Sequence, residues 1–312
     1  MTATRTPRAL RRLAAAVGAT LLLSACSTNS PLGTPSAEPS GPTAAATTLV
    51  IGSQQYYSNE IIAELYAQAL EAAGHTIQRQ YQIGQREVYL PEVEAGKIDL
   101  MPEYSGNLLQ YYDAKTTAKS SEEVVTALAS ALPQGLRPLA AAAATDQDSY
   151  NVTSEFAAQH GLTSLEDLAK VPGPIKVAAN SEVAERPYGP KGLKEFYGVD
   201  VTVVPVEDSG GPLTVKALKD GTVQAADIYS ADPAIATNNF VTLSDPKNMI
   251  LPQNVVPIVS AKVDAAAAAV IDKVSAALTT EELVGLNARS VTEQAASADI
   301  AKEWLTTKGL LG

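Results

Sequence analysis

Short β-rich runs alternate with amphipathic stretches in the first half of the chain. A β-rich run at residues 48–53 precedes apolar side chains that recur at helical spacing up to Gly74, a residue suited to end a helix. Strands are predicted at residues 76–81 and 98–101, with a helix at 87–95 between them. This alternation is typical of an α/β unit with a mainly parallel sheet flanked by helices.

The same order returns later in the chain, which predicts a second α/β unit. The predicted strands lie at residues 175–178, 201–206 and 223–228, and the predicted helices between them lie at 191–197 and 212–219. The C-terminal stretch has helical patterns at residues 266–278, 281–287 and 295–304.

One spacing occurs in both units. Gly96 precedes Tyr104 by eight positions, Gly221 precedes Tyr229 by the same eight, and a serine follows each tyrosine. Each tyrosine then lies at the carboxyl end of a parallel strand, where ligands of open α/β sheets bind. If the two units face each other, the tyrosines face a shared cleft. The alternative is a chance likeness between two short helix-glycine-strand units.

The two α/β units predict a protein of two lobes. The chain passes between the lobes twice, so lobe I is made of two separate stretches. Residues 48–146 and 242–312 form lobe I, and residues 147–241 form lobe II. The crossings near Ala144–Asp148 and Asn239–Thr242 are the predicted hinge strands.

The N-terminal residues are predicted to direct export. Residues 1–25 combine a basic start with an apolar run that is about half of the roughly 20 residues needed to span a bilayer, which favours a cleaved signal peptide over a retained helix. Cys26 follows small residues, as in the lipobox of bacterial lipoproteins, so we expect it to carry a lipid and not to lie in a core. The remainder of residues 26–47 is rich in Ser, Thr, Pro, Gly and Ala and reads as a flexible tether.

The charge of the chain excludes several partners. The formal net charge is −11, and residues 1–25 hold four of the positive charges and none of the negative ones, which leaves about −15 after cleavage. Nucleic acid and anionic lipid surfaces both need a basic patch, so neither is expected.

Catalytic and metal-binding patterns are also lacking in the sequence. The chain has one cysteine, no spaced pair of histidines and no glycine-rich phosphate loop, so we expect no metal and no cofactor. Aromatic usage is skewed instead, with twelve Tyr against three Phe and one Trp. A tyrosine offers a π face to a cation and a hydroxyl to a polar group, which suits a closable pocket, although packing accounts for several of the twelve.

Four segments resemble a known family, at residues 49–54, 60–66, 96–106 and 185–193. Residues 96–106 read Gly-Lys-Ile-Asp-Leu-Met-Pro-Glu-Tyr-Ser-Gly and are the most specific of them. The chain resembles the osmoprotectant-binding proteins of ABC importers, which capture glycine betaine, choline, carnitine and related quaternary amines. The resemblance implies a type II periplasmic-binding-protein fold with the ligand cleft between two lobes. It also implies a monomer, lipid-anchored to the outer face of the cytoplasmic membrane, that delivers its ligand to an ABC permease.

The resemblance also implies site residues. Tyr104, Tyr150 and Tyr229 correspond to aromatic walls around a methylated ammonium group. Arg186 corresponds to a ligand-carboxylate partner, since its fork can grip two oxygens. The predicted hydrogen-bond partners are Gln54 and Asn107.

The chain departs from the family pattern in the return segment. Where many relatives have an aromatic residue after a proline, this chain reads Leu-Pro-Gln-Asn at Leu251–Asn254. The aromatic box is then incomplete, with Asn254 offering an amide. Tyr188 either replaces the missing wall or is an exposed turn residue.

Three other functions remain open at this point. A binding protein for another small solute, such as an amino acid or an aromatic compound, would share the fold. An enzyme on the same fold would need an acid/base pair or a reactive cysteine, and the sequence shows neither. A purely structural envelope lipoprotein would have a shallow interlobe surface without converging polar groups.

Overall fold

The computed structural model describes residues 48–311. The predicted signal peptide, the lipidation site Cys26 and the tether lie outside the described residues. Within residues 48–311, no helix combines the length and the apolar character that a bilayer crossing requires.

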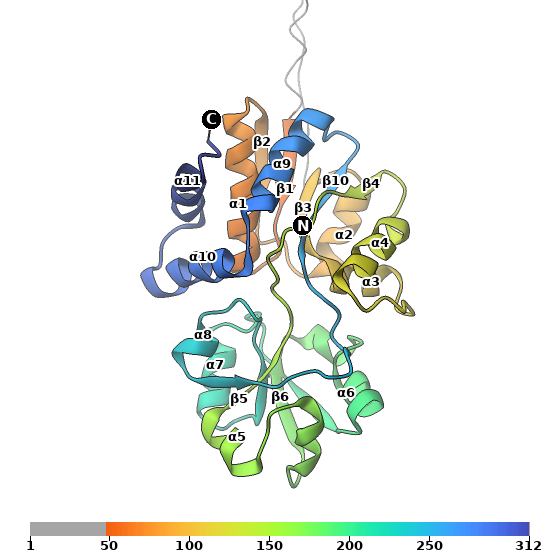
Figure 1. The fold of residues 1–312 in the computed structure, drawn as a ribbon, viewed down its shortest axis with the longest axis vertical. Helices are drawn as coiled ribbons and strands as arrows, with labels where there is room; N and C mark the ends of the chain where they lie inside the picture. Colours follow the sequence, from red (N-terminus) through yellow and green to blue (C-terminus); the bar gives the residue numbers. More distant parts are fainter. Residues whose placement is uncertain (1–47, 312) are drawn as a thin grey trace, which may run out of the picture. The chain divides into compact units, whose positions relative to one another are not determined.

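Lobe I is built on a five-stranded mixed sheet with the strand order β2-β1-β3-β10-β4 (Figure 1). The first three strands in this order are mutually parallel, whereas β10 runs antiparallel to both of its neighbours. The strands are β1 (Thr48–Gly52), β2 (Thr76–Gln80), β3 (Leu100–Tyr104), β4 (Leu136–Pro138) and β10 (Val255–Ser260).

Helices cover both faces of this sheet (Figure 1). On one face, α1 (Tyr57–Ala72) packs against three helices from the C-terminal end of the chain, and the fully buried Leu65 and Tyr66 lie in that core. Successive residues of β1 point to opposite faces, so Leu49 joins this core and Val50 packs against the other. The remaining helices are α9 (Ala265–Ala277), α10 (Thr280–Glu293) and α11 (Ser297–Lys308) on the first face, and α2 (Arg86–Glu94), α3 (Ser105–Tyr112) and α4 (Ser121–Ala131) on the second.

Lobe II repeats the plan with the strand order β7-β6-β8-β5-β9. Its first three strands in this order are parallel, and β5 runs antiparallel to both β8 and β9. The strands are β5 (Tyr150–Thr153), β6 (Ile175–Ala179), β7 (Val201–Pro205), β8 (Ala225–Asp227) and β9 (Phe240–Thr242). The helices are α5 (Ser154–His160), α6 (Pro190–Tyr197), α7 (Pro212–Lys219) and α8 (Ala234–Thr237), with short 3₁₀ helices at Leu165–Lys170 and Ser181–Ala184.

The prediction of two α/β lobes is confirmed, and each sheet is mixed, because antiparallel strands extend the parallel core of each lobe. The second crossing lies later than predicted. Residues Phe240–Thr242 form β9 of lobe II, and Met249 and Ile250 still pack in the core of lobe II. Leu251, directly after them, packs in a core of lobe I.

The two crossings run antiparallel and side by side. Thr145 and Asn254 form an isolated antiparallel bridge, and the amide of Asp146 donates to the carbonyl oxygen of Gln253 at 3.2 Å. The chain therefore enters and leaves lobe II through one narrow connection.

Candidate functional site between the lobes

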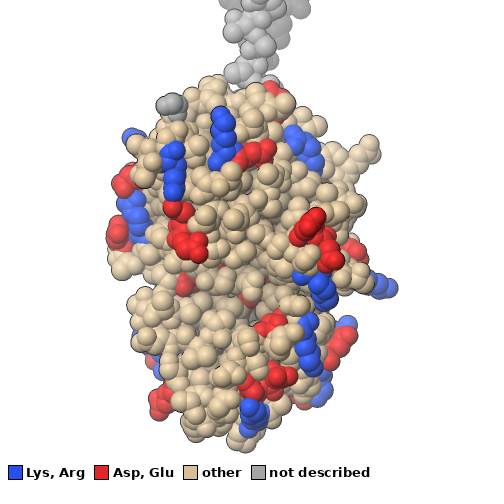
Figure 2. Space-filling model, in the orientation of Figure 1, with Lys and Arg blue, Asp and Glu red and all other residues tan. Residues whose placement is uncertain are grey.

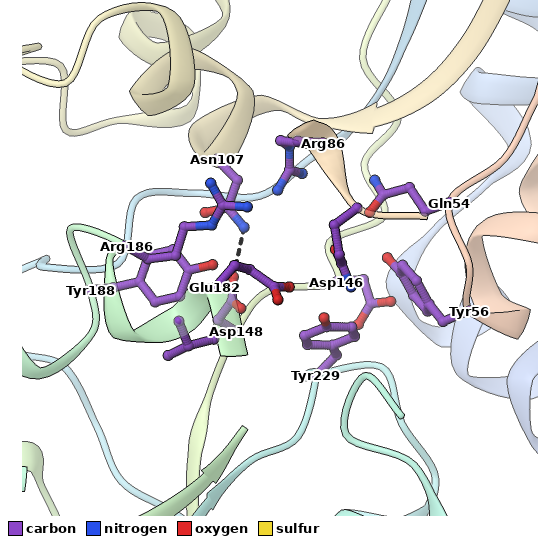
Figure 3. Close-up of a pocket in the computed structure, with 12 residues that line it drawn as sticks. Gln54, Tyr56, Arg86, Asn107, Asp146, Asp148, Glu182, Arg186, Tyr188 and Tyr229 are labelled. Carbon is purple, nitrogen blue, oxygen red and sulfur yellow. Dashed lines mark hydrogen bonds between the residues drawn. The ribbon is translucent and has the colours of Figure 1, made fainter. Parts of the chain in front are cut away.

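A cavity lies where the two lobes meet, at the carboxyl ends of the parallel strands of both sheets (Figure 3). Its lining residues come from lobe I, from the outgoing crossing and from lobe II. They are Gln54, Tyr56, Gln85, Arg86, Asn107, Asp146, Asp148, Glu182, Val183, Arg186, Tyr188 and Tyr229. The cavity volume is about 20 Å³, roughly the room that one water molecule needs. A larger solute can enter only if side chains or lobes move apart.

Three tyrosine rings meet on one side of the cavity. The ring of Tyr56 is stacked on Tyr104 with 6.3 Å between centroids and meets Tyr229 edge-on at 5.1 Å. Tyr56 directly precedes α1, whereas Tyr104 ends β3 and lies behind Tyr56 with 3% of its surface exposed. Tyr56 and Tyr229 line the cavity, and Tyr104 supports Tyr56 from behind.

A second tyrosine pair belongs to lobe II. Tyr188 lines the cavity, and the hydroxyl of the buried Tyr150 donates to the backbone oxygen of Tyr188 at 2.7 Å. Tyr150 therefore supports the wall formed by Tyr188, in the same way that Tyr104 supports Tyr56.

Two arginines point into the cavity from different lobes (Figure 3). Arg86 donates to both oxygens of Glu103, and Tyr89 donates its hydroxyl to the same carboxylate, all within the interior of lobe I. Arg186 instead reaches across to Glu87 of α2, with N–O distances of 2.8 and 3.2 Å. Each arginine thus has one carboxylate partner, and the Arg186 pair joins the lobes.

Buried carboxyl groups also lie in and around the cavity. Burial raises the pKa of Asp146 to about 7, although the amide of Ala231 and the hydroxyl of Ser58 donate to it. Asp148 accepts a hydrogen bond at 2.7 Å from the side chain of Asn107 in lobe I. Burial and the neighbouring Asp148 hold the pKa of the Asp227 carboxyl well above its usual range. The raised pKa values of Asp146 and Asp227 favour their neutral forms, and a cation bound beside them would favour the ionised forms.

Five of the predicted residues line the cavity, and three do not. The five are Gln54, Asn107, Arg186, Tyr188 and Tyr229. Tyr104 and Tyr150 lie one layer behind the lining. Asn254 also lies outside it, because its amide donates to the backbone oxygen of Ala142 and its own backbone amide donates to Ser105. Its neighbour Gln253 is fully buried and holds Asn107 through two hydrogen bonds.

The sequence analysis missed the remaining lining residues. Tyr56 and Gln85 follow strands in the same way as the predicted Gln54, so their positions carried a usable signal. Asp146 and Asp148 lie in the crossing predicted as a hinge. Nothing in the sequence pattern singled out Glu182 or Val183.

Metal ligands and basic surfaces do not shape this region. Within the described range 48–311, no group of three or more His, Cys, Asp or Glu side chains is arranged to hold a metal ion. On the face drawn in Figure 2, Lys and Arg are interspersed with Asp and Glu over both lobes and form no broad basic patch among the described residues.

The sequence matches the model of a known protein family. A family model described as OpuAC, the substrate binding domain of ABC-type glycine betaine transport systems, matches residues 47–307. The glycine betaine-binding protein YehZ of Escherichia coli (strain K12) is 27% identical over 284 residues, which cover 86% of this chain and 93% of YehZ.

Two solved structures share the fold. The structure of apo YehZ from Escherichia coli gives a TM-score of 0.62 at 25% identity and covers 85% of this chain and 100% of that one. A structure described as a glycine betaine/carnitine/choline ABC transporter gives a TM-score of 0.69 at 20% identity, with coverage of 85% and 100%.

Proposed function

Because the chain belongs to the OpuAC family of substrate-binding domains of ABC-type glycine betaine transport systems, we propose that it captures a quaternary-amine osmoprotectant between its lobes. This is a family of transport proteins and not of enzymes. The observation that carries the proposal is the make-up of the cavity, which has tyrosine faces and carboxylates for a cation and two arginines for a carboxylate.

The proposed binding mode follows from the side chains on each side of the cavity. Tyr56 and Tyr229 offer ring faces to the methylated ammonium group. Burial, and after it the neighbouring Tyr104 and Asp146, hold the pKa of Tyr56 well above its usual range, so a carboxyl group lies near this ring. Arg86 and Arg186 hold the carboxylate of a zwitterionic ligand. The buried Nε2 of Gln54 has no hydrogen-bond partner in the structure, so we assign it to a polar group of the ligand.

Delivery to a permease requires that the bound form differ from the free form. The cavity of about 20 Å³ is too small for a trimethylammonium group, which exceeds one water molecule, so the lobes separate to admit the ligand. Contacts from both lobes then favour the closed state. In this proposal the closed protein docks as a monomer on an ABC permease, and a lipid on Cys26 holds it at the outer face of the cytoplasmic membrane.

The test is a titration of the compact unit of residues 45–312 with glycine betaine, choline, carnitine and proline betaine. Tyrosine fluorescence and calorimetric heat report binding. We expect saturable binding to at least one ligand, and a roughly two- to thirtyfold loss of affinity in Tyr229→Ala, since a cation–π contact contributes about 0.5 to 2 kcal/mol.

Tyr111→Ala is the matched control, because Tyr111 is exposed on α3 and does not line the cavity. Its affinity should equal that of the wild type. If the folded unit binds none of the four ligands, the quaternary-amine proposal is abandoned in favour of another small solute, with amino acids tested next.

A further inference from the structure

The two tyrosine turns hold the two crossings by the same pair of hydrogen bonds. In lobe I, the amide of Ser105 donates to the backbone oxygen of Asn254 at 3.0 Å, and the amide of Asn254 donates back to the Ser105 hydroxyl at 3.1 Å. In lobe II, the amide of Ser230 donates to the backbone oxygen of Gln147 at 2.9 Å, and the amide of Gln147 donates back to the Ser230 hydroxyl at 3.0 Å. We call these two ring-shaped contacts the Ser105 clasp and the Ser230 clasp.

A third hydrogen bond extends each clasp. The side-chain oxygen of Gln253, on the return crossing, accepts from the amide of Asn107 at 2.9 Å. The carboxylate of Asp146, on the outgoing crossing, accepts from the amide of Ala231 at 3.0 Å. In both lobes, the residue preceding the clasped position therefore caps the chain just after the tyrosine turn. This shared geometry gives a structural reason for the repeated Tyr-Ser spacing.

The contacts along each crossing show where the chain changes lobe. On the outgoing crossing, Thr145 is still bonded to Thr280 of lobe I, and Gln147 is already clasped to lobe II. On the return crossing, Ile250 packs in the core of lobe II and Leu251 packs in a core of lobe I. The chain therefore changes lobe at Asp146 on one crossing and at the Ile250–Leu251 junction on the other.

We propose that Ser105 and Ser230 are positioning residues that tie the tyrosine turns to the hinge. The Ser230 hydroxyl fixes its turn on Gln147, next to Asp146, and the Ser105 hydroxyl fixes its turn on Asn254, three residues after Leu251. Bending between the lobes is thereby confined to Asp146 and the Ile250–Leu251 junction, and Tyr104 and Tyr229 move with their lobes as rigid parts. The inference rests on the proposed function in one respect, the closure of the lobes around a ligand. Its structural part, the confinement of bending, does not depend on any ligand.

The experiment measures the interlobe distance directly. The sole cysteine of the chain, Cys26, lies outside the compact unit of residues 45–312. Cysteines introduced at the exposed Lys115 of lobe I and Lys191 of lobe II therefore accept one spin label each. The width of the distance distribution without ligand is recorded for the parent, Ser105→Ala, Ser230→Ala and the double variant.

We expect each alanine variant to widen the distribution, and the double variant to widen it most. Ser105→Thr and Ser230→Thr keep the hydroxyl and should restore the parent width. Amide hydrogen exchange should quicken at Asn254 in Ser105→Ala and at Gln147 in Ser230→Ala, because each amide loses its acceptor. If the parent binds ligand, each alanine variant should bind it with a dissociation constant about two- to tenfold higher than that of the parent, as expected for the loss of one hydrogen bond.

Ser275→Ala is the control for a buried hydroxyl lost elsewhere, since Ser275 is fully buried and hydrogen-bonded to Tyr66 at 3.0 Å. It should lower the melting temperature without widening the distribution. Parent-like widths in both clasp variants, failure of the threonine variants to restore the width, or equal widening in Ser275→Ala would each overturn the proposal. A parent that binds no quaternary amine contradicts the proposed function instead, and the widths still decide the role of the clasps.

Discussion

The two lobes contribute unequal halves to the cavity between them. Arg86 of lobe I is enclosed in an ion pair whose side chains are 6% and 0% exposed, whereas Arg186 of lobe II pairs with a glutamate that is 51% exposed. The Ser105 clasp ends in the neutral Gln253, and the Ser230 clasp ends in the titratable Asp146. The architecture is repeated, but the chemistry is not.

This difference shows which half of the cavity has its geometry set before a ligand binds. The lobe I half is held by buried contacts made within that lobe, so its geometry does not depend on the position of lobe II. The lobe II half depends on a cross-lobe ion pair and on Asp146 of the outgoing crossing, whose pKa is raised by burial to about 7. Pre-organising one half limits the ordering that a ligand must impose on binding.

The largest expected effect comes from removing the buried ion pair between Arg86 and Glu103 in lobe I. Glu103→Gln leaves Arg86 buried without its counter-charge, so we expect the free energy of unfolding to fall by about 3–5 kcal/mol. Urea unfolding followed by circular dichroism measures this change. A loss under 1 kcal/mol would show that the buried pair does not fix this half.

A smaller effect is expected from Gly106, which follows the Ser105 clasp. A Cβ atom there lies 2.7 Å from Leu251 Cβ and 2.7 Å from the Pro252 oxygen, so Gly106→Ala must displace the return crossing. We expect a loss of about 1–3 kcal/mol by urea unfolding. In lobe II the matching position holds Ala231, which is fully buried. Stability equal to the wild type in Gly106→Ala would mean that the return crossing yields freely.

The third prediction sharpens the contrast between Gln253 and Asp146. The pKa of Asp146 is about 7 in the folded chain, raised by burial and by the neighbouring Asp232 and Asp148, against about 3.9 in an unfolded one. The folded chain binds the extra proton between these values, so the stability gained from the protonated carboxyl is full below pH 4 and is lost as the pH rises through 7.

Asp146→Asn cannot ionise, so the variant should gain on the wild type as the pH rises. Between pH 6 and pH 8 the difference in unfolding free energy should shift in its favour by about 1 kcal/mol. Urea unfolding at the two pH values gives this number. An identical difference at both would contradict the assigned titration.

The smallest expected effect lies in the cross-lobe pair. Glu87→Gln removes the partner of Arg186 at a half-exposed position, so we expect a loss of only about 0.2–1 kcal/mol. The loss should shrink further in high salt because dissolved ions screen the attraction between Arg186 and Glu87. A loss as large as that of Glu103→Gln would erase the distinction between the two halves.

The sequence predicted the parts of the fold that have local signals. Helix α7 spans the predicted residues 212–219, because Pro212 and the preceding glycine mark its start. Strand β10 was missed, since its residues Val255–Ser260 are buried on both faces, show no alternation and include Pro257.

Whether a residue lines the cavity or lies behind its wall was harder to predict than whether it lies near the cavity. Tyr56 and Tyr104 both lie at turns beside the cleft, and only three-dimensional packing decides that Tyr56 is in front. Arg86 was missed because its role depends on Glu103, 17 residues away on a different element. Gln54 and Asn107 line the cavity, and the family resemblance had named both as ligand partners.

The position of β10 in the lobe I sheet has a consequence for the order in which the chain folds. This strand lies between β3 and β4, yet it follows all of lobe II in the sequence, and the helices that pack on α1 come later still. The strands of lobe II form one continuous stretch from Tyr150 to Thr242. During synthesis, lobe II therefore has its complete sheet before lobe I does, although lobe I begins first. The N-terminal lobe is the last to be finished.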